Sequence, residues 1–185
     1  STLLAQTDWR GDVWCRRQDG SDCPVSLSLS RIGDSAPHGL RYVAVFSDIS
    51  QRLQREAEIR HQALHDGLTG VANRRLMMER LQHWLALSAR QPQRIAVLFM
   101  DLDGFKAVND EFGHEMGDWV LQTVARRLQG LLRAADTVAR LGGDEFVIVL
   151  QQTDHPEAVS TVAERIMTAL AEPICHQGVS VRVGV

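Results

Sequence analysis

The stretch IAVLFMDLDGFK, from Ile95 to Lys106, decides the fold of this chain. Its first six residues are apolar without interruption and include β-branched and aromatic members, which predicts a strand buried on both faces of a sheet. Asp101 and Asp103 follow at once, so we expect their carboxylates where that strand ends. The stretch therefore predicts a polar site at the edge of a buried sheet.

A second segment, RLGGDEF from Arg140 to Phe146, supplies further acidic residues. Residues 137–141 and 146–150 are typical of the two arms of a β-hairpin, and Gly142 and Gly143 are typical of its turn. If this hairpin pairs beside the strand that ends at Asp101, Asp144 can reach an ion that Asp101 holds. Two convergent carboxylates beside a glycine turn favour magnesium, which binds a few carboxylate oxygens together with substrate phosphates.

Four motifs follow one another in the chain: DGLTG (66–70) with NRR (73–75), DLDGFKAVND (101–110), GHEMGD (113–118) and RLGGDEF (140–146). Alone, a DxD after a strand or a GG turn is more typical of a structural turn than of a site. Together they resemble the GGDEF domain of diguanylate cyclases, from about residue 61 to the last residue. The resemblance implies an α+β fold with a palm-like sheet of the nucleotidyl-cyclase type, flanked by helices.

The resemblance also implies a reaction. Diguanylate cyclases are transferases that join two GTP molecules, one on each subunit of a homodimer, into the bacterial second messenger cyclic di-GMP and release pyrophosphate. Asp101, Asp144 and the Leu102 carbonyl match the family's ligands for Mg²⁺ or Mn²⁺, and Asp144 and Glu145 match its catalytic acids. The alternative is a catalytically silent module that binds GTP or cyclic di-GMP and regulates a partner.

Guanine presents two neighbouring hydrogen-bond donors, N1–H and the exocyclic amine, which one carboxylate can accept together. Asp118 matches the family residue in this role, and Asn109 matches its partner on the same base edge. Asp118 is also typical of an acid near a helix N-terminus, because a helical apolar pattern follows it. This pattern consists of Val120, Leu121, Val124, Leu128, Leu131 and Leu132.

The phosphates of the nucleotide are expected beside two glycine-containing turns. By resemblance, Gly104, Phe105 and Lys106 contribute mainly backbone N–H groups, with Gly142 and Gly143 of the second turn nearby. Lys106 is the only lysine in the chain. A direct phosphate contact and an ordinary surface position are equally open for it.

Arg133-Ala134-Ala135-Asp136 stands upstream of the GG turn at the spacing of the family's RxxD inhibitory site, where the product binds back on the domain. A guanidinium can make a paired contact with phosphate, and a carboxylate can accept from guanine. The alternative for Arg133 and Asp136 is a surface ion pair.

The N-terminal residues have the alternation of antiparallel strands, at 13–17, 25–29 and 40–48, with a turn at 18–20. The segments GDVWCRRQDGSDCPVSLSLS and YVAVFSDISQR resemble the C-terminal part of a PAS sensor domain, over residues 1–49. No ligand can be assigned to this part. Residues 50–65 predict a linker or signalling helix capped by Ser50, as a short parallel coiled coil or as a helix packed on its own domain.

The GGDEF domain is assigned to residues 66–185 and is expected to be C-terminally incomplete, since the family continues for another helix and strand. We therefore expect weak or no activity from the chain as given. Further output or membrane segments, including a phosphodiesterase domain, are possible outside it. The expected sheet core consists of Val97, Leu98, Phe99, Val147, Ile148 and Val149, packed by helical Leu81, Leu85, Leu121, Val124 and Leu128.

The bulk composition fits a regulator without a nucleic-acid polymer as partner, because the formal net charge is −3. Lacking an apolar segment that spans a bilayer, the chain is expected in the cytoplasm, with a parent protein that could be membrane-anchored. Three cysteines without metal-type spacing, Cys15, Cys23 and Cys175, favour reduced structural thiols.

Overall fold

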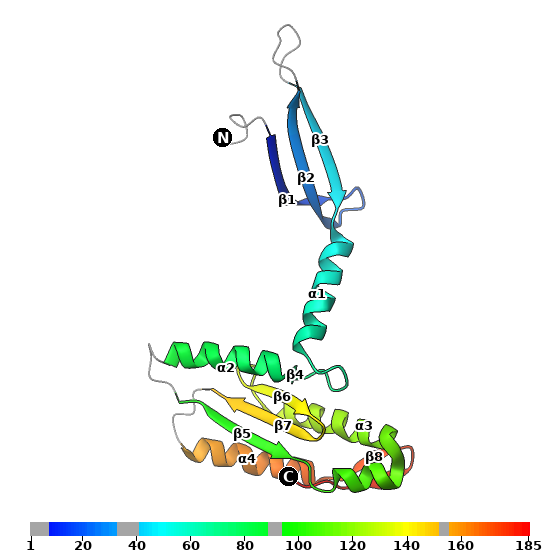
Figure 1. Cartoon of the computed structure of the whole chain (residues 1–185), viewed down its shortest axis with the longest axis vertical. Coiled ribbons are helices and arrows are strands. Elements are labelled where there is room, and N and C mark those ends of the chain that lie inside the picture. The colour runs from blue at the N-terminus through cyan, green and yellow to red at the C-terminus, as the bar shows by residue number, and fades with distance from the viewer. Residues whose placement is uncertain (1–7, 33–40, 89–93, 152–155) are drawn as a thin grey trace. The chain divides into compact units, whose positions relative to one another are not determined.

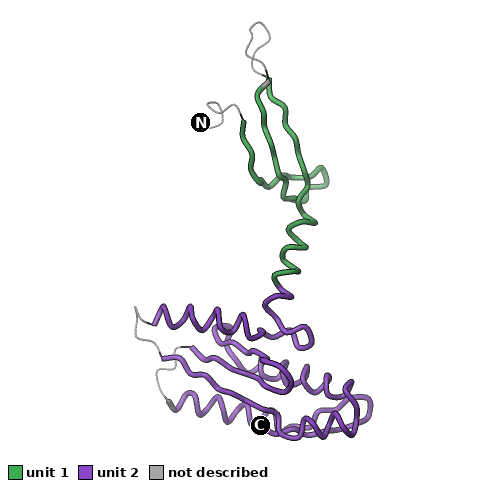
Figure 2. Tube along the Cα trace, viewed as in Figure 1, with its two compact units in different colours: residues 1–60 green, residues 61–185 purple. Residues whose placement is uncertain are grey.

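The computed structural model describes residues 8–32, 41–88, 94–151 and 156–185. The chain forms two compact units, residues 1–60 and residues 61–185, which Figure 2 shows in different colours. Each unit has its own sheet. Across the described residues, every helix is too short or too polar to cross a bilayer.

The first unit is a three-stranded antiparallel sheet in the order β1-β2-β3 (Figure 1). Its strands are β1 (Asp8–Arg16), β2 (Asp22–Ile32) and β3 (Arg41–Asp48), so the predicted strand pattern is confirmed. The turn between β1 and β2 closes where Asp19 accepts the N–H of Ser21 at 2.9 Å. The predicted strand start at Leu40 lies outside the described residues.

Helix α1 (Ser50–Leu64) confirms the predicted linker helix. Its start differs from the prediction, because Ser50 is the first helical residue and does not act as the cap. The carboxylate of Asp48 instead accepts the N–H of Ser50 at 2.8 Å and satisfies a donor that the helix leaves free. No residue of α1 is buried.

The second unit contains a four-stranded sheet in the order β4-β6-β7-β5. Its strands are β4 (Ala72–Asn73), β5 (Ala96–Asp101), β6 (Thr137–Gly142) and β7 (Glu145–Leu150). β4 runs parallel to β6, and the remaining pairs are antiparallel. The predicted hairpin, β6 and β7, and its pairing beside β5 are therefore confirmed.

Helices cover both faces of this sheet (Figure 1). α2 (Arg74–Ser88) packs on one face, where Met77 and Leu81 contact Val147 and Val149. α3 (Phe105–Leu131) and α4 (Pro156–Ala171) pack on the other face, together with a two-stranded sheet of β8 (Ile174–His176) and β9 (Val179–Val181). The expected α+β fold, a sheet flanked by helices, is confirmed.

The prediction that the strand before Asp101 is buried on both faces is wrong. β5 lies at the edge of the sheet, and its side chains alternate, with Val97 40% and Phe99 75% exposed. The cause is the position of α2, which packs mainly against β4 and β6, whereas β5 lies beyond β7 at the other edge of the sheet. Leu85 of α2 was also expected in the core and is 56% exposed. The buried members of the expected core are Val147, Ile148, Val149, Leu121, Val124 and Leu128.

Candidate functional site

The acidic residues of the two central motifs meet at one end of the sheet. Asp101 is the last residue of β5 and stands opposite Glu145, the first residue of β7. Asp144 precedes Glu145 in the β6–β7 turn. Strand register therefore places Asp144 and Glu145 at the same end of the sheet as Asp101, which lies more than forty positions earlier in the chain.

The carboxylate and carbonyl oxygens at this end of the sheet are suitable ligands for a hard divalent cation. Asp101 and Asp144 offer carboxylates, and among the described residues the Leu102 carbonyl accepts one hydrogen bond, from the N–H of Phe105 at 3.3 Å, which leaves its second lone pair for a cation. Within the described ranges no group of three or more His, Cys, Asp or Glu side chains converges on one point. Magnesium does not need such a cage, since it keeps several waters and binds substrate phosphates.

The predicted phosphate segment is held in place by backbone pairing. Asp103 exchanges two main-chain hydrogen bonds with Gly184, at 3.0 and 3.2 Å. Directly after it, Gly104 takes the cap position of α3, with Phe105 and Lys106 in the first helical turn. A helix N-terminus presents N–H groups that have no partner inside the helix, so this turn is suitable for binding an anion.

The predicted guanine-binding residues lie on two sides of a kink in α3. Gly113 has φ 82° and ψ 168°, which breaks the helix into two segments. Across the kink, Asn109 lies against Gly117, where an added Cβ would stand 2.0 Å from the Asn109 Oδ1 atom. The absence of a side chain at Gly117 thus allows Asn109 to lie next to the residue that precedes Asp118.

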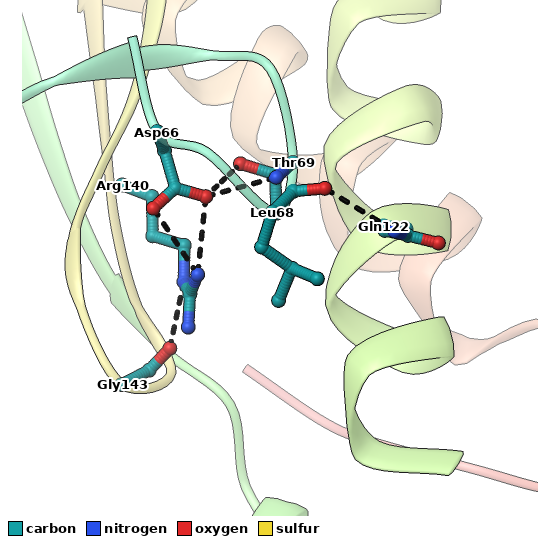
Figure 3. Close-up of polar contacts among 6 residues, drawn as sticks. All are labelled: Asp66, Leu68, Thr69, Gln122, Arg140 and Gly143. Carbon is teal, nitrogen blue, oxygen red and sulfur yellow. Dashed lines mark hydrogen bonds and ion pairs between the residues drawn. The ribbon is translucent and has the colours of Figure 1, made fainter. Parts of the chain in front are cut away.

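An ion pair that the sequence did not predict supports the glycine turn (Figure 3). Arg140 donates from Nη1 to both carboxylate oxygens of Asp66, and from Nε to the Gly143 carbonyl at 2.8 Å. Asp66 also accepts the N–H and the hydroxyl of Thr69, at 2.9 and 2.6 Å. Burial opposes ionisation of Asp66, but the hydrogen bonds from Thr69 and Arg140 outweigh it and lower the pKa of this carboxyl.

Arg140 and Asp66 each belong to a motif that the sequence shows, but the contact between them depends on tertiary structure. The DGLTG loop is itself anchored to α3, where Gln122 donates to the Leu68 carbonyl at 3.2 Å (Figure 3). The glycine turn is therefore fixed by a loop that directly follows α1 in the chain.

The predicted inhibitory pair lies at the other end of β6 from the glycine turn. Asp136 accepts the backbone N–H of Arg133 at 3.0 Å and that of Gln151 at 3.2 Å, so its carboxylate closes the turn before β6. Arg133 and Asp136 both line a cavity of about 240 Å³ between the end of α3 and α4. The same cavity is also lined by Arg165 of α4, which the motif spacing did not reveal.

Comparisons with known proteins identify the family of the second unit. The family model "Diguanylate cyclase, GGDEF domain" matches residues 63–185. The bifunctional diguanylate cyclase/cyclic di-GMP phosphodiesterase MucR of Pseudomonas aeruginosa is 49% identical over 111 residues, 60% of this chain and 16% of MucR. A signaling protein of Caulobacter vibrioides is 37% identical over 169 residues, 89% of this chain and 21% of the relative.

Among solved structures, the coiled coil and GGDEF domain of DgcB from Caulobacter crescentus, in complex with c-di-GMP, superposes with a TM-score of 0.66. It is 27% identical, and the match covers 72% of each chain. The present chain thus spans less than a quarter of the two curated relatives described above, whereas it spans most of this solved domain.

Proposed function

Because the chain belongs to the GGDEF family of diguanylate cyclases, we propose that it joins two GTP molecules into cyclic di-GMP with release of pyrophosphate. The observation that carries the proposal is the register of β5 against β7, which sets Asp101 opposite Glu145 with Asp144 in the adjoining turn. The substrate GTP places this reaction in the cytoplasm.

The chemistry is a displacement at the α-phosphorus of one GTP by the 3′-hydroxyl of the other. Asp144 and Asp101, with the Leu102 carbonyl, would hold Mg²⁺ or Mn²⁺, which neutralises charge on the phosphate oxygens. Asp144 or Glu145 would accept the proton of the attacking hydroxyl. The backbone of Gly104–Lys106 and the Gly142–Gly143 turn would orient the triphosphate.

Base selection follows from the two segments of α3. Asp118 accepts both donors of the guanine edge, and Asn109, positioned by the small residue Gly117, supplies an amide at the same edge. Adenine has no matching pair of donors for Asp118. The substrate is therefore GTP and not ATP.

Regulation would act at two places. Residues 1–49 would serve as the remnant of a PAS sensor that controls the cyclase through α1. The similarity to a signaling protein extends over 169 residues, which is more than the second unit contains, and this supports a shared N-terminal part. Product would inhibit by binding at Arg133 and Asp136, in the cavity that Arg165 also lines. Since each subunit holds one GTP, the active form is a homodimer.

The test is incubation with GTP and magnesium, with chromatographic detection of the dinucleotide and a separate measurement of GTP binding. We expect weak turnover by the unaltered chain, none in Asp144→Ala, and the same weak turnover in Glu164→Gln on α4, which alters an exposed acid away from the site. Turnover that survives Asp144→Ala would reject the mechanism. Magnesium-dependent GTP binding without product would support the silent binding module instead.

A further inference from the structure

Two of the three cysteines face each other across the first sheet. In the register of β1 and β2, Cys15 and Cys23 are direct partners. Facing residues of antiparallel strands have Cα atoms about 4.5–5.5 Å apart and side chains on the same face. This separation lies inside the range of about 4.4–6.8 Å that a disulfide spans.

Both thiols are free, and their surroundings differ. Cys23 is 8% exposed, whereas Cys15 is half-buried. The pKa of the Arg17 guanidinium is raised above its usual value, first by the Cys23 side chain and then by Asp48. Arg17 lies in the connection between β1 and β2, which the two cysteines enclose.

Arg17 connects this part of the sheet to the linker helix. Its Nη2 atom donates to the carboxylate of Asp48, which lies at the end of β3. The other oxygen of Asp48 accepts the N–H of Ser50, the first residue of α1. The contacts of Arg17 and Asp48 therefore connect the β1–β2 connection, which the two cysteines enclose, to the start of the helix.

We propose that Cys15 and Cys23 form a reversible redox-active dithiol whose state is transmitted through Arg17 and Asp48 to the first turn of α1. The co-reactant is a peroxide. One thiol loses its proton and attacks a peroxide oxygen, the O–O bond breaks, and the sulfenic acid forms as the leaving hydroxide takes that proton and becomes water. The second thiol then attacks the sulfenic sulfur in the same way, and its proton and the displaced hydroxide give another water. Two thiols and one hydrogen peroxide thus give one disulfide and two waters.

This site adds to the proposed function, and the dithiol itself does not depend on cyclase activity. Only the consequence for output depends on the role of α1 as a signalling helix. Formation of the disulfide ties the two ends of the β1–β2 connection together and constrains Arg17 within it. The cap that Asp48 provides for α1 is then expected to loosen, because the constrained Arg17 no longer keeps its ion pair with Asp48.

The first experiment treats the 185-residue chain with hydrogen peroxide and counts thiols after denaturation. We expect three thiols to fall to one, with recovery by dithiothreitol. Trypsin cleaves after Arg16 and Arg17, between the two cysteines, so the disulfide appears by mass spectrometry as a linked pair of peptides. Cys175→Ser should still lose two thiols, and Cys15→Ser should form no internal disulfide. An unchanged count, or a bond that requires Cys175, would overturn the site.

A matched pair of arginine variants tests the role of Arg17. Arg17→Gln should still form the disulfide, but oxidation should no longer change amide exchange in the first turn of α1, because the ion pair with Asp48 is lost. Arg16→Gln is the control, since Arg16 is the neighbour of Arg17 but pairs with Asp22 at 3.0 Å. An equal response of α1 to oxidation in the two variants would contradict the assignment.

Hydrogen exchange tests the link to α1 without any activity measurement. The Leu53 amide, which donates to Ile49 in the first turn, should exchange at least about threefold faster in the oxidised chain and in Asp48→Asn, because an unstabilised helix end frays. Disulfide formation with unchanged exchange at Leu53 would reject the transmission step. Faster exchange without any change in cyclase output would instead contradict only the proposed sensory control.

Discussion

The Arg140 guanidinium reaches both carboxylate oxygens of Asp66, at 3.0 and 3.2 Å, across 74 positions of the chain. Their side chains are only 12% and 22% exposed. Since Arg140 also holds the Gly143 carbonyl, this pair fixes the glycine turn to the loop that follows α1. Removal of one partner would leave the other charge half-buried without compensation.

Asp66→Asn should therefore destabilise the second unit by about 1–3 kcal/mol, the usual cost of losing a charged hydrogen-bonding partner. Urea unfolding followed by circular dichroism measures this change. Glu79→Gln is a suitable control, because it removes the partner of Arg75 in an exposed pair on α2 and should cost less than about 0.5 kcal/mol. Equal effects of the two substitutions would contradict the structural role of Asp66.

The same carboxyl predicts a pH dependence. The pKa of Asp66 in the folded protein lies below its value of 3.8 in the unfolded chain. The contribution of Asp66 to the free energy of unfolding is therefore complete above pH 3.8. The contribution is lost as the pH falls through the lower folded-state pKa. The stability difference between the unaltered chain and Asp66→Asn should thus be constant from pH 7 to about 5 and shrink below about 4. A difference that grows on acidification would exclude this assignment.

Gly117→Ala should weaken GTP binding with little loss of stability. A Cβ at Gly117 would overlap the Asn109 Oδ1 atom, so the amide must leave its position. We expect the KM for GTP to rise roughly tenfold, equivalent to one net hydrogen bond of about 1–1.5 kcal/mol. Gly130→Ala is the control on the same helix, because an added Cβ meets nothing within 4 Å there. It should leave the KM unchanged and stabilise α3 slightly.

Arg165→Ala should relieve product inhibition, because Arg165 lines the cavity of Arg133 and Asp136. The inhibition constant for cyclic di-GMP is expected to rise about tenfold in Arg165→Ala and in Arg133→Ala, as for the loss of one charged phosphate contact. Arg126→Ala on α3, whose guanidinium lies over the Trp119 ring, should not change it. Unaltered inhibition in Arg165→Ala would remove this residue from the site.

Two phenylalanines of neighbouring strands should differ strongly in their contribution to stability. Phe146 is fully buried, and Phe146→Ala should cost about 3–5 kcal/mol. Phe99 is 75% exposed, and Phe99→Ala should cost less than about 1 kcal/mol. Denaturant midpoints of both variants test this order. A loss at Phe99 as large as that at Phe146 would show that the outer face of β5 is covered in solution.

Sequence patterns predicted the hairpin of β6 and β7, its place beside β5, and the linker helix, because each depends on local periodicity and turn residues. The same patterns wrongly predicted that Val97 and Phe99 are buried. An apolar run shows that a strand belongs to a sheet, but the burial of each face depends on where a distant helix packs. The Asp48 cap of α1 was missed for a similar reason, since a Ser in the sequence is an equally good cap.

By itself, the sequence determined the family, the α+β class and the residue types available for a nucleotide and a divalent cation. Tertiary structure alone decided which of these residues meet: Asp101 with Glu145 through strand register, Arg140 with Asp66 through loop packing, and Cys15 with Cys23 through β1–β2 pairing. The reason is physical. Residue identity sets what a side chain can bind, whereas contacts between distant residues arise only when the sheet and its helices pack.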